Sequence, residues 1–323
     1  MVKILFLVFL SFILLGCQKG TKYDLIEVIE IGAYFFGAKR EYVFIYPFEF
    51  EGDYIRIPYF FEGASKNTNA DVGWLLFVNG LPLKTRLVCT NNEWEREKSY
   101  LHNFSASYQE RFTFFAYFKP SINFYDTSIP VVAILIFQPD FIPSVENPIF
   151  GIFHEISQTI TKEIKIQHVI QHYKDYLHFN LNNEYLEYFS DFILTPAIDN
   201  VRIGILPNHI KYPILYEHKV YDYLGFLDLS IFAVGMKNGT YRLSFFINHL
   251  PVQMNGYDFI ELKVLSDNVI FKKELTFNLN EIDELTKKNV IYIVKSDVNS
   301  IGIRDSIVKS PSLLLINTLY GSD

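Results

Sequence analysis

The chain has 323 residues, of which 50% are hydrophobic and 17% aromatic, with 31 Phe and 22 Tyr. This length and hydrophobicity exclude a disordered chain and favour two folded domains over one. The net charge of −7 leaves no basic footprint for nucleic acid, so no nucleic-acid partner is expected.

The N-terminus has the composition of an export signal. Lys3 supplies a positive charge, and Ile4 to Ile13 is an apolar run interrupted only by Ser11. Crossing a bilayer takes about 20 apolar residues. A run of roughly ten is therefore too short for a permanent span and suits the hydrophobic region of a signal peptide.

The end of this run, Leu14-Leu15-Gly16-Cys17, resembles the lipobox of bacterial lipoproteins. The resemblance covers residues 1–17 and implies cleavage between Gly16 and Cys17, with diacylglycerol on the Cys17 sulfur. Each buried methylene of an acyl chain contributes about 0.8 kcal/mol, so two or three chains anchor a protein durably. We therefore expect a signal peptide over 1–17, a tether over 18–24, and a membrane-attached chain at the extracytoplasmic face of a bacterial cell envelope. No cofactor besides the covalent lipid is expected.

The chain beyond the tether has the pattern of a β protein, because short apolar or alternating segments recur between turn signals. The first domain is expected over residues 25–150. Alternating aromatic positions in Arg111–Phe118 predict a half-buried strand, and Pro130–Phe137 predicts a central one. Asn91–Lys98 is expected to be a loop. Further strands are predicted at 25–36, 41–50, 53–61, 74–78 and 83–89, with 83–89 pairing back on 74–78.

Residues 151–200 form a connecting segment whose structure the sequence leaves ambiguous. Isoleucines at positions 156, 160 and 164 fit one face of a helix, whereas those at 160, 164, 166 and 170 fit a strand. We favour the strand.

The second domain is expected over residues 201–323. Asn238-Gly239 predicts a hairpin of Leu229–Gly235 with Thr240–Ile247, and a second hairpin is predicted from Tyr257–Leu265 and Val269–Phe277. Asn280 suits a helix N-cap, so Glu281–Lys288 is expected to be the one short helix after the signal peptide.

A six-residue motif occurs twice at the end of an apolar strand. Asn79 and Pro82 of Phe77-Val78-Asn79-Gly80-Leu81-Pro82 recur as Asn248 and Pro251, an offset of 169 (248 − 79). A repeat in a matching context favours homologous modules. We therefore predict two immunoglobulin-like β-sandwiches, although the Cys-Trp-Cys pattern of true members is absent.

Motifs of familiar enzymes are missing: the chain has no G-x-S-x-G, P-loop, G-x-G-x-x-G or H-E-x-x-H sequence. His168, His172 and His178 are the metal candidates, because the first two would share one face of a helix and could bind one zinc ion. A surface group of histidines in a polar segment is the alternative. Cys89, alone once Cys17 is lipidated, is expected to be a buried apolar residue.

We expect the chain to be a lipid-anchored binding or assembly module that contacts an envelope protein, a peptide or a glycan. One alternative is an anchored hydrolase of wall or extracellular polymer, for which Glu93, Glu95 and Glu97 offer acids but no opposed pair. The other is a metal-binding lipoprotein that uses the three histidines. The sequence favours a non-enzymatic role.

Overall fold

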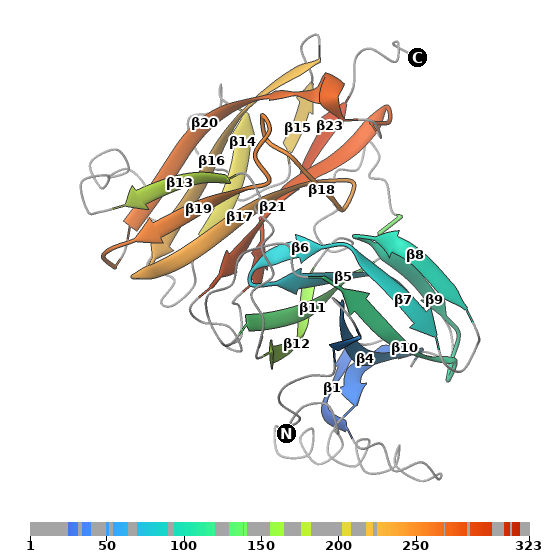
Figure 1. Cartoon of the computed structure of the whole chain (residues 1–323). Helices are drawn as coiled ribbons and strands as arrows, with labels where there is room; N and C mark the ends of the chain where they lie inside the picture. The colour runs from blue at the N-terminus through green and yellow to red at the C-terminus, as the bar shows by residue number, and fades with distance from the viewer. Residues whose placement is uncertain are drawn as a thin grey trace, which may run out of the picture.

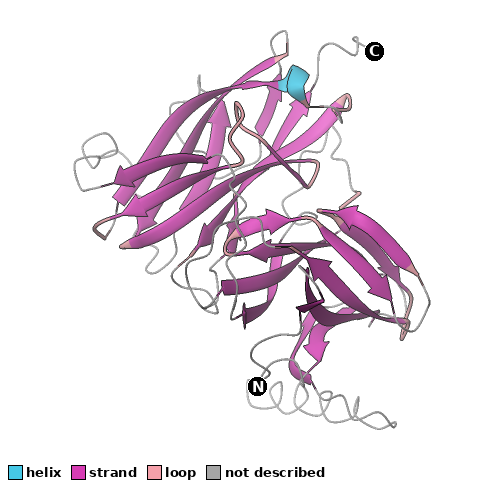
Figure 2. Ribbon diagram, in the orientation of Figure 1, coloured by secondary structure: helices cyan, strands magenta, loops and turns pink. Residues whose placement is uncertain are grey.

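The structure, a computed structural model, confirms a mainly β protein, with one short helical turn in the part of the chain that it describes (Figures 1 and 2). No helix among the described residues is long and apolar enough to span a membrane. The described residues are 25–31, 34–39, 50–51, 54–63, 70–89, 94–119, 129–137, 139–140, 156–164, 176–181, 202–207, 218–221, 225–267, 269–282, 285–298, 307–310 and 312–316.

The first half of the chain contributes two antiparallel sheets. Sheet A has seven strands in the order β1-β2-β4-β10-β7-β8, with β3 beside β4, and sheet B has five in the order β12-β11-β5-β6, with β9 beside β5. The strands are β1 (Leu25–Ile31), β2 (Tyr34–Lys39), β3 (Phe50–Glu51), β4 (Tyr54–Gly63), β5 (Ala70–Val78), β6 (Leu81–Leu83), β7 (Thr85–Cys89), β8 (Glu95–Ser99), β9 (His102–Ala106), β10 (Arg111–Phe118), β11 (Ile129–Phe137) and β12 (Ile156–Ile164).

The second half contributes two more sheets. Sheet C has eight strands in the order β13-β19-β17-β21-β23-β15, with β18 beside β17 and β22 beside β21, and sheet D is β14-β16-β20. Strands β13 and β15 pair in parallel with β19 and β23. The strands are β13 (Tyr176–Leu181), β14 (Arg202–Pro207), β15 (His218–Tyr221), β16 (Phe226–Met236), β17 (Gly239–Ile247), β18 (Leu250–Val252), β19 (Phe259–Val264), β20 (Val269–Asn278), β21 (Lys288–Asp297), β22 (Ile307–Lys309) and β23 (Leu313–Ile316).

Each half encloses a core between its two sheets. In the first, Trp74 on sheet B lies 5.5 Å from Tyr59 and 5.7 Å from Phe114 on sheet A, measured between ring centroids. In the second, Phe245 on sheet C lies 4.5 Å from Phe277 on sheet D. Period-two alternation along these strands sends every second side chain into a core.

A third apolar cluster joins the halves, because the outward faces of sheets B and C pack on each other. We call this cluster the joint. The four sheets are therefore stacked in the order A, B, C, D, and strands β5, β11, β17 and β21 are covered on both faces. Each large apolar side chain buried this way contributes roughly 1.5–3 kcal/mol. The joint consists of Leu75, Phe77, Val132, Ile134, Ile136, Phe246, Val290, Tyr292, Val294 and Ile307.

The repeated motif forms the same hairpin twice, β5–β6 and β17–β18. Asn79 and Gly80 have φ of 49° and 76°, and Asn248 and His249 have φ of 48° and 66°. Two central residues with positive φ define a type I′ turn, which suits the twist of a two-residue hairpin. Pro82 pairs with Phe77, as Pro251 pairs with Phe246.

The strand order around these hairpins also matches. Strand β5 lies between β11 on one side and β6 with β9 on the other, and β17 lies likewise between β21 and the pair β18 and β19. The motif therefore marks the same place in sheets B and C.

Two strand pairings predicted from turn signals are wrong, and a third, of 83–89 with 74–78, holds only at Leu83, which pairs with Leu76. Residues 229–235 lie in sheet D and 240–247 in sheet C. Residues 257–265 lie in sheet C and 269–277 in sheet D. Both turns therefore connect facing sheets. Only Leu81–Leu83 pairs back on β5, and β7 joins β10 in sheet A. The reason is burial: Leu229 and Leu243 both belong to the core between sheets C and D, so these segments face each other across it.

The expected helix over Glu281–Lys288 is also wrong. The chain makes a single 3₁₀ turn, η3 (Leu279–Glu281), capped by Asn278 rather than Asn280, and Lys288 already begins β21. Ile282 and Leu285 pack against the second core. A short segment gains more from that packing than from a marginal isolated helix.

Two further segments refine the sequence interpretation. The strand preference for the ambiguous segment holds at Ile156–Ile164, where β12 extends sheet B, while β13 extends sheet C. The expected loop over Asn91–Lys98 contains β8 instead, which pairs with β7 and carries Glu95 and Glu97.

Candidate functional site

The sequence-predicted site residues fall partly outside the described part of the chain. Gly16, Cys17, His168, His172 and the tether 18–24 all lie outside it. His178 is described and lies on β13, at the edge of sheet C. Among the described residues no three His, Cys, Asp or Glu side chains gather in a way that could hold a metal ion.

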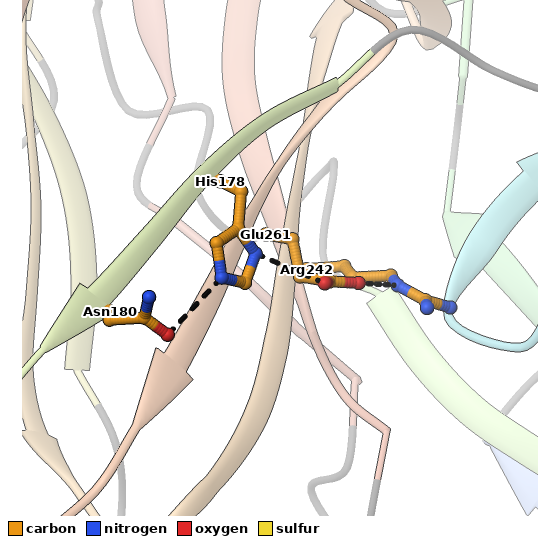
Figure 3. Close-up of polar contacts among 4 residues, drawn as sticks. All are labelled: His178, Asn180, Arg242 and Glu261. Atoms are coloured by element: carbon orange, nitrogen blue, oxygen red, sulfur yellow. Dashed lines mark hydrogen bonds and ion pairs between the residues drawn. The ribbon is translucent and has the colours of Figure 1, made fainter.

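His178 belongs instead to a polar row that crosses three strands (Figure 3). It pairs in register with Glu261 on β19, which pairs in register with Arg242 on β17. His178 Nδ1 lies 3.3 Å from Glu261 Oε1, and Arg242 Nε donates to Glu261 Oε2 at 3.0 Å. His178 Nε2 lies 3.2 Å from Asn180 Oδ1. One carboxylate thus has a partner on each side.

Arg242 extends this row to the first half of the chain. Its Nη1 donates to the carbonyl oxygen of Asn79, in the turn of the β5–β6 hairpin. Gly80 in the same turn lies so close to Ser296 that an added Cβ would be 2.8 Å from the Ser296 Cβ. The hairpin tip therefore sits directly on the β17–β21 strand pair.

The polar row connects strands β13, β19 and β17 with one another and with the turn of the β5–β6 hairpin. The side chains of Arg242 and Glu261 are 11% and 15% exposed, whereas that of His178 is 40% exposed. Partly buried ion pairs are screened less by water than exposed ones, and losing one partner leaves an uncompensated charge. We interpret the row as the polar fastening of the joint.

In each half, side chains on or beside an edge strand, β8 or β13, also contact the facing sheet. Arg96 on β8 stacks over Trp94 and Phe104, with Cζ 4.7 and 4.3 Å from the ring centroids, and donates to the Asn103 carbonyl on β9. In the second half, the ring centroid of Phe179 on β13 lies 5.5 Å from that of Phe271 on β20, and Lys273 lies over the Phe179 ring.

Two buried histidines serve the packing of the halves. His249 Nδ1 is hydrogen-bonded to Tyr292 Oη at 2.9 Å, and burial raises the pKa of Tyr292. His102 Nε2 donates to the Thr85 carbonyl at 2.9 Å. Burial lowers the pKa of His102 to about 4, against the opposing effect of that hydrogen bond. Both imidazoles are therefore structural.

The outward face of sheet A carries a second candidate site, which the sequence analysis did not identify. Tyr117 on β10 pairs in register with Arg56 on β4 and with Arg86 on β7. Arg86 Cζ lies 4.7 Å from the Tyr117 ring centroid, and Arg56 Cζ lies 4.7 Å from that of Phe115. The signal in the sequence was the other alternation of Arg111–Phe118, which places Thr113, Phe115 and Tyr117 opposite the core.

Cys89 and Glu95, which the sequence analysis considered as candidate site residues, are not part of a catalytic arrangement among the described residues. Cys89 is buried in the first core, as expected from its strand position. Glu95 forms an exposed ion pair of 2.9 Å with Arg86, so it faces an arginine and not a second carboxylate. The described part of the three-glutamate group thus gives no opposed acid pair.

Comparisons with known proteins place the chain in no family. No protein family model and no curated protein matches it. Among solved structures, the CupB6 tip adhesin from Pseudomonas aeruginosa is 7% identical over 82% of this chain and 90% of that chain, with a TM-score of 0.18. CBD12 from CALX1.2 is 10% identical over 79% of this chain and 77% of that one, with a TM-score of 0.16. The calcium binding domain CBD12 of CALX1.1 is 11% identical over 76% and 75%, with a TM-score of 0.17. Similarities this low carry no argument about function.

Proposed function

We propose that the protein is a lipid-anchored binding module of a bacterial cell envelope, held by a diacylglycerol on Cys17 at the extracytoplasmic face. The observation that carries the proposal is the order charge, apolar run, Leu14-Leu15-Gly16-Cys17, followed within eight residues by the first strand of sheet A. The anchor would therefore lead almost directly into the sheet stack. A tether of seven residues reaches at most about 25 Å.

The stack suits a display and binding role. Its joint makes one body of the two halves, and the polar row around Glu261 fastens it. A rigid scaffold that presents side chains on fixed strands loses little entropy when it binds a partner. The partner class is an envelope protein, a peptide or a glycan.

We further propose that the two halves are duplicated immunoglobulin-like sandwiches. Support comes from the repeated hairpins and from the matching neighbours of β5 and β17. Sheets A and D also share a three-strand order, with β2-β4-β10 corresponding to β14-β16-β20.

Metabolic labelling tests the anchor. Cells that express the full chain are given an alkyne-tagged palmitate, and the purified protein is examined for label and by mass spectrometry. The wild type is expected to carry label and to start at Cys17, whereas C17A is expected to carry none. C89A, which removes the other cysteine, is the matched control and is expected to label normally. An unlabelled wild type with residues 1–16 intact would refute the anchor.

A further inference from the structure

We propose that two copies of the chain pair with each other along the free edge of β20 (Val269–Asn278) and form a symmetric dimer. Sheet D has the order β14-β16-β20, so β20 is bonded to β16 on one side. On its other side no strand pairs with it among the described residues, and it lies along the outer margin of the second half (Figure 1). The proposal goes beyond the binding role and does not depend on it.

The middle of this edge is open to a partner. Residues 272, 273, 274 and 276 are exposed and Leu275 is half-buried, although the strand covers a core between two sheets. The side chains of Lys272 and Glu274 are 48% and 62% exposed. A free edge presents main-chain N–H and C=O groups to any extended strand, so it invites pairing.

The two faces of β20 carry different side chains. Phe271 and Leu275 pack into the core between sheets C and D. Lys272 and Glu274 lie on the opposite face, where they form an ion pair of 3.3 Å within the strand. Directly opposite residues of an antiparallel pair point to the same face of the sheet. A strand that pairs with itself must therefore match apolar side chains on one face and opposite charges on the other.

Among registers that keep both cores on one side of the shared sheet, the register with Lys273 on the two-fold axis meets both requirements. It places Lys272 of each copy opposite Glu274 of the other, and Phe271 opposite Leu275. Each pair occurs twice, as a two-fold interface requires. Moving the axis by one residue sets Lys272 opposite Lys272 or Glu274 opposite Glu274, and in both cases Lys273 faces an apolar side chain. Opposite charges across strands stabilise pairing, whereas like charges oppose it.

The two lysines of β20 select the kind of partner strand. Lys273 Nζ lies 5.6 Å from the ring centroid of Phe179, on β13 in the facing sheet, so its charge is directed towards its own copy. Lysines on an edge discourage an uncharged strand. A partner strand that brings a carboxylate opposite Lys272 is favoured, and Glu274 of a second copy does so.

A second charged edge strand, β8, lacks this match. Centred on Arg96, self-pairing of β8 sets Glu95 opposite Glu97, and centred on Glu97 it sets Arg96 opposite Lys98. Centred on Lys98, it sets two lysines opposite each other. The edge of β8 therefore repels a second copy and serves as an internal control for β20.

Pairing along β20 joins the three-stranded sheets D of two copies into one continuous sheet. Two anchored copies then present two binding modules side by side. Simultaneous attachment of both modules raises avidity without any new contact to the partner.

Disulfide trapping tests the contact. The full chain carries Lys273→Cys in a Cys89→Ala background, and membranes from expressing cells are oxidised mildly before non-reducing electrophoresis. Directly opposite residues have Cα atoms about 4.5–5.5 Å apart, which a disulfide can span. We expect K273C to give a covalent homodimer, and Lys98→Cys, exposed on β8, to give no more than C89A alone. If K273C is crosslinked no better than K98C, or is linked to a different protein, the proposal is overturned.

A charge swap tests the register by sedimentation equilibrium of the purified full chain in density-matched detergent. K272E and E274K each replace two attractive cross-strand pairs by two repulsive ones and are expected to weaken self-association at least about tenfold. K272E/E274K restores both pairs and should associate within about threefold of the wild type. Below the dissociation constant, Lys272 and Glu274 are again an exposed ion pair within one copy.

The melting temperature of all three variants should match that of the wild type, because both positions are exposed. A wild type that stays monomeric at every concentration would refute the dimer. Single variants that associate as the wild type does, or a double variant as weak as the single ones, would refute the pairing of Lys272 with Glu274.

Discussion

Phe77 and Phe246 occupy the same position of the repeated motif and contact each other across the joint, with ring centroids 6.1 Å apart. Each precedes its hairpin turn by one residue and faces away from the core of its own half. A contact between equivalent residues is typical of a two-fold interface, in which one surface meets a copy of itself. Within one chain this arrangement follows naturally if a module that once met a copy of itself was duplicated.

Truncation at this contact should destabilise the protein strongly. Phe246→Ala empties a fully buried position against Phe77 and Tyr292, whose ring stacks on Phe246 at 5.2 Å. Large-to-small changes of buried aromatic residues cost about 3–5 kcal/mol in the free energy of unfolding. Urea denaturation measures the loss. Phe226→Ala, at a side chain 49% exposed, is the control and should stay within about 0.5 kcal/mol.

The close approach of the first hairpin can be tested with two glycines of similar backbone. Gly80 and Gly256 have φ of +76° and +84°, but only at Gly80 would a Cβ meet a neighbour, the Ser296 Cβ at 2.8 Å. Gly256→Ala should cost about 1 kcal/mol of unfolding free energy through backbone strain alone. Gly80→Ala should cost at least about 2 kcal/mol, because contact is added to strain. Equal losses would show that the hairpin tip does not press on β21.

The polar row is expected to contribute to stability through coupling between Arg242 and Glu261. A double-mutant cycle with Arg242→Gln and Glu261→Gln should give a coupling energy of about 1–2 kcal/mol, because both side chains are mostly buried. The exposed pair Lys272–Glu274, at 3.3 Å with exposures of 48% and 62%, is the control. Its coupling should be below about 0.5 kcal/mol. A coupling energy near zero between Arg242 and Glu261 would show that this ion pair does not stabilise the fold.

His102 should make the stability of the chain depend on pH. Its pKa is lowered from 6.5 to about 4 in the folded state, so the unfolded state binds the proton more readily. The contribution of His102 to the free energy of unfolding is therefore fully present above pH 6.5. It is lost as the pH drops from 6.5 towards 4, by up to about 3 kcal/mol. Unfolding free energies between pH 4 and 7 should fall more steeply in the wild type than in His102→Gln. Parallel curves would exclude the effect.

The sequence predicted strands well where a local pattern was enough. Arg111–Phe118 is a strand at those bounds, and Pro130–Phe137 lies in the middle of sheet B with both faces covered. The Asn79-Gly80 turn was also found, because Asn-Gly is the residue pair that a type I′ turn needs.

Pairing between strands could not be predicted in the same way. The Asn238-Gly239 turn reverses the chain, but it leads from sheet D to sheet C, and Asn238 N–H bonds to the Asp267 side chain at 2.9 Å in the neighbouring inter-sheet turn. Alternation assigns a side chain to a core without saying whether the next strand lies beside it or opposite. That choice depends on long-range packing that no short window contains.

The candidate sites were missed for a related reason. His178 was singled out as a metal ligand with His168 and His172, whereas its described partner, Glu261, is 83 positions away in the sequence (261 − 178) and enters only through strand register. The strand Arg111–Phe118 was predicted from its core-facing alternation alone, so Tyr117 on its other face was not singled out. Arg56 and Arg86 become its neighbours only once β4 and β7 are placed on either side of β10.

The double coverage of β5, β11, β17 and β21 has a consequence for how this protein can evolve. Successive side chains of these strands face two different apolar layers. Leu76 and Phe245 face the cores of their own halves, whereas Leu75 and Phe246 face the joint, so neither of two neighbouring positions should tolerate polar substitution. A saturation library selected for folding should therefore show these strands as unbroken blocks of restricted positions. Strands β10 and β20 should instead show tolerant positions between restricted ones, because side chains of their second face are at least partly exposed.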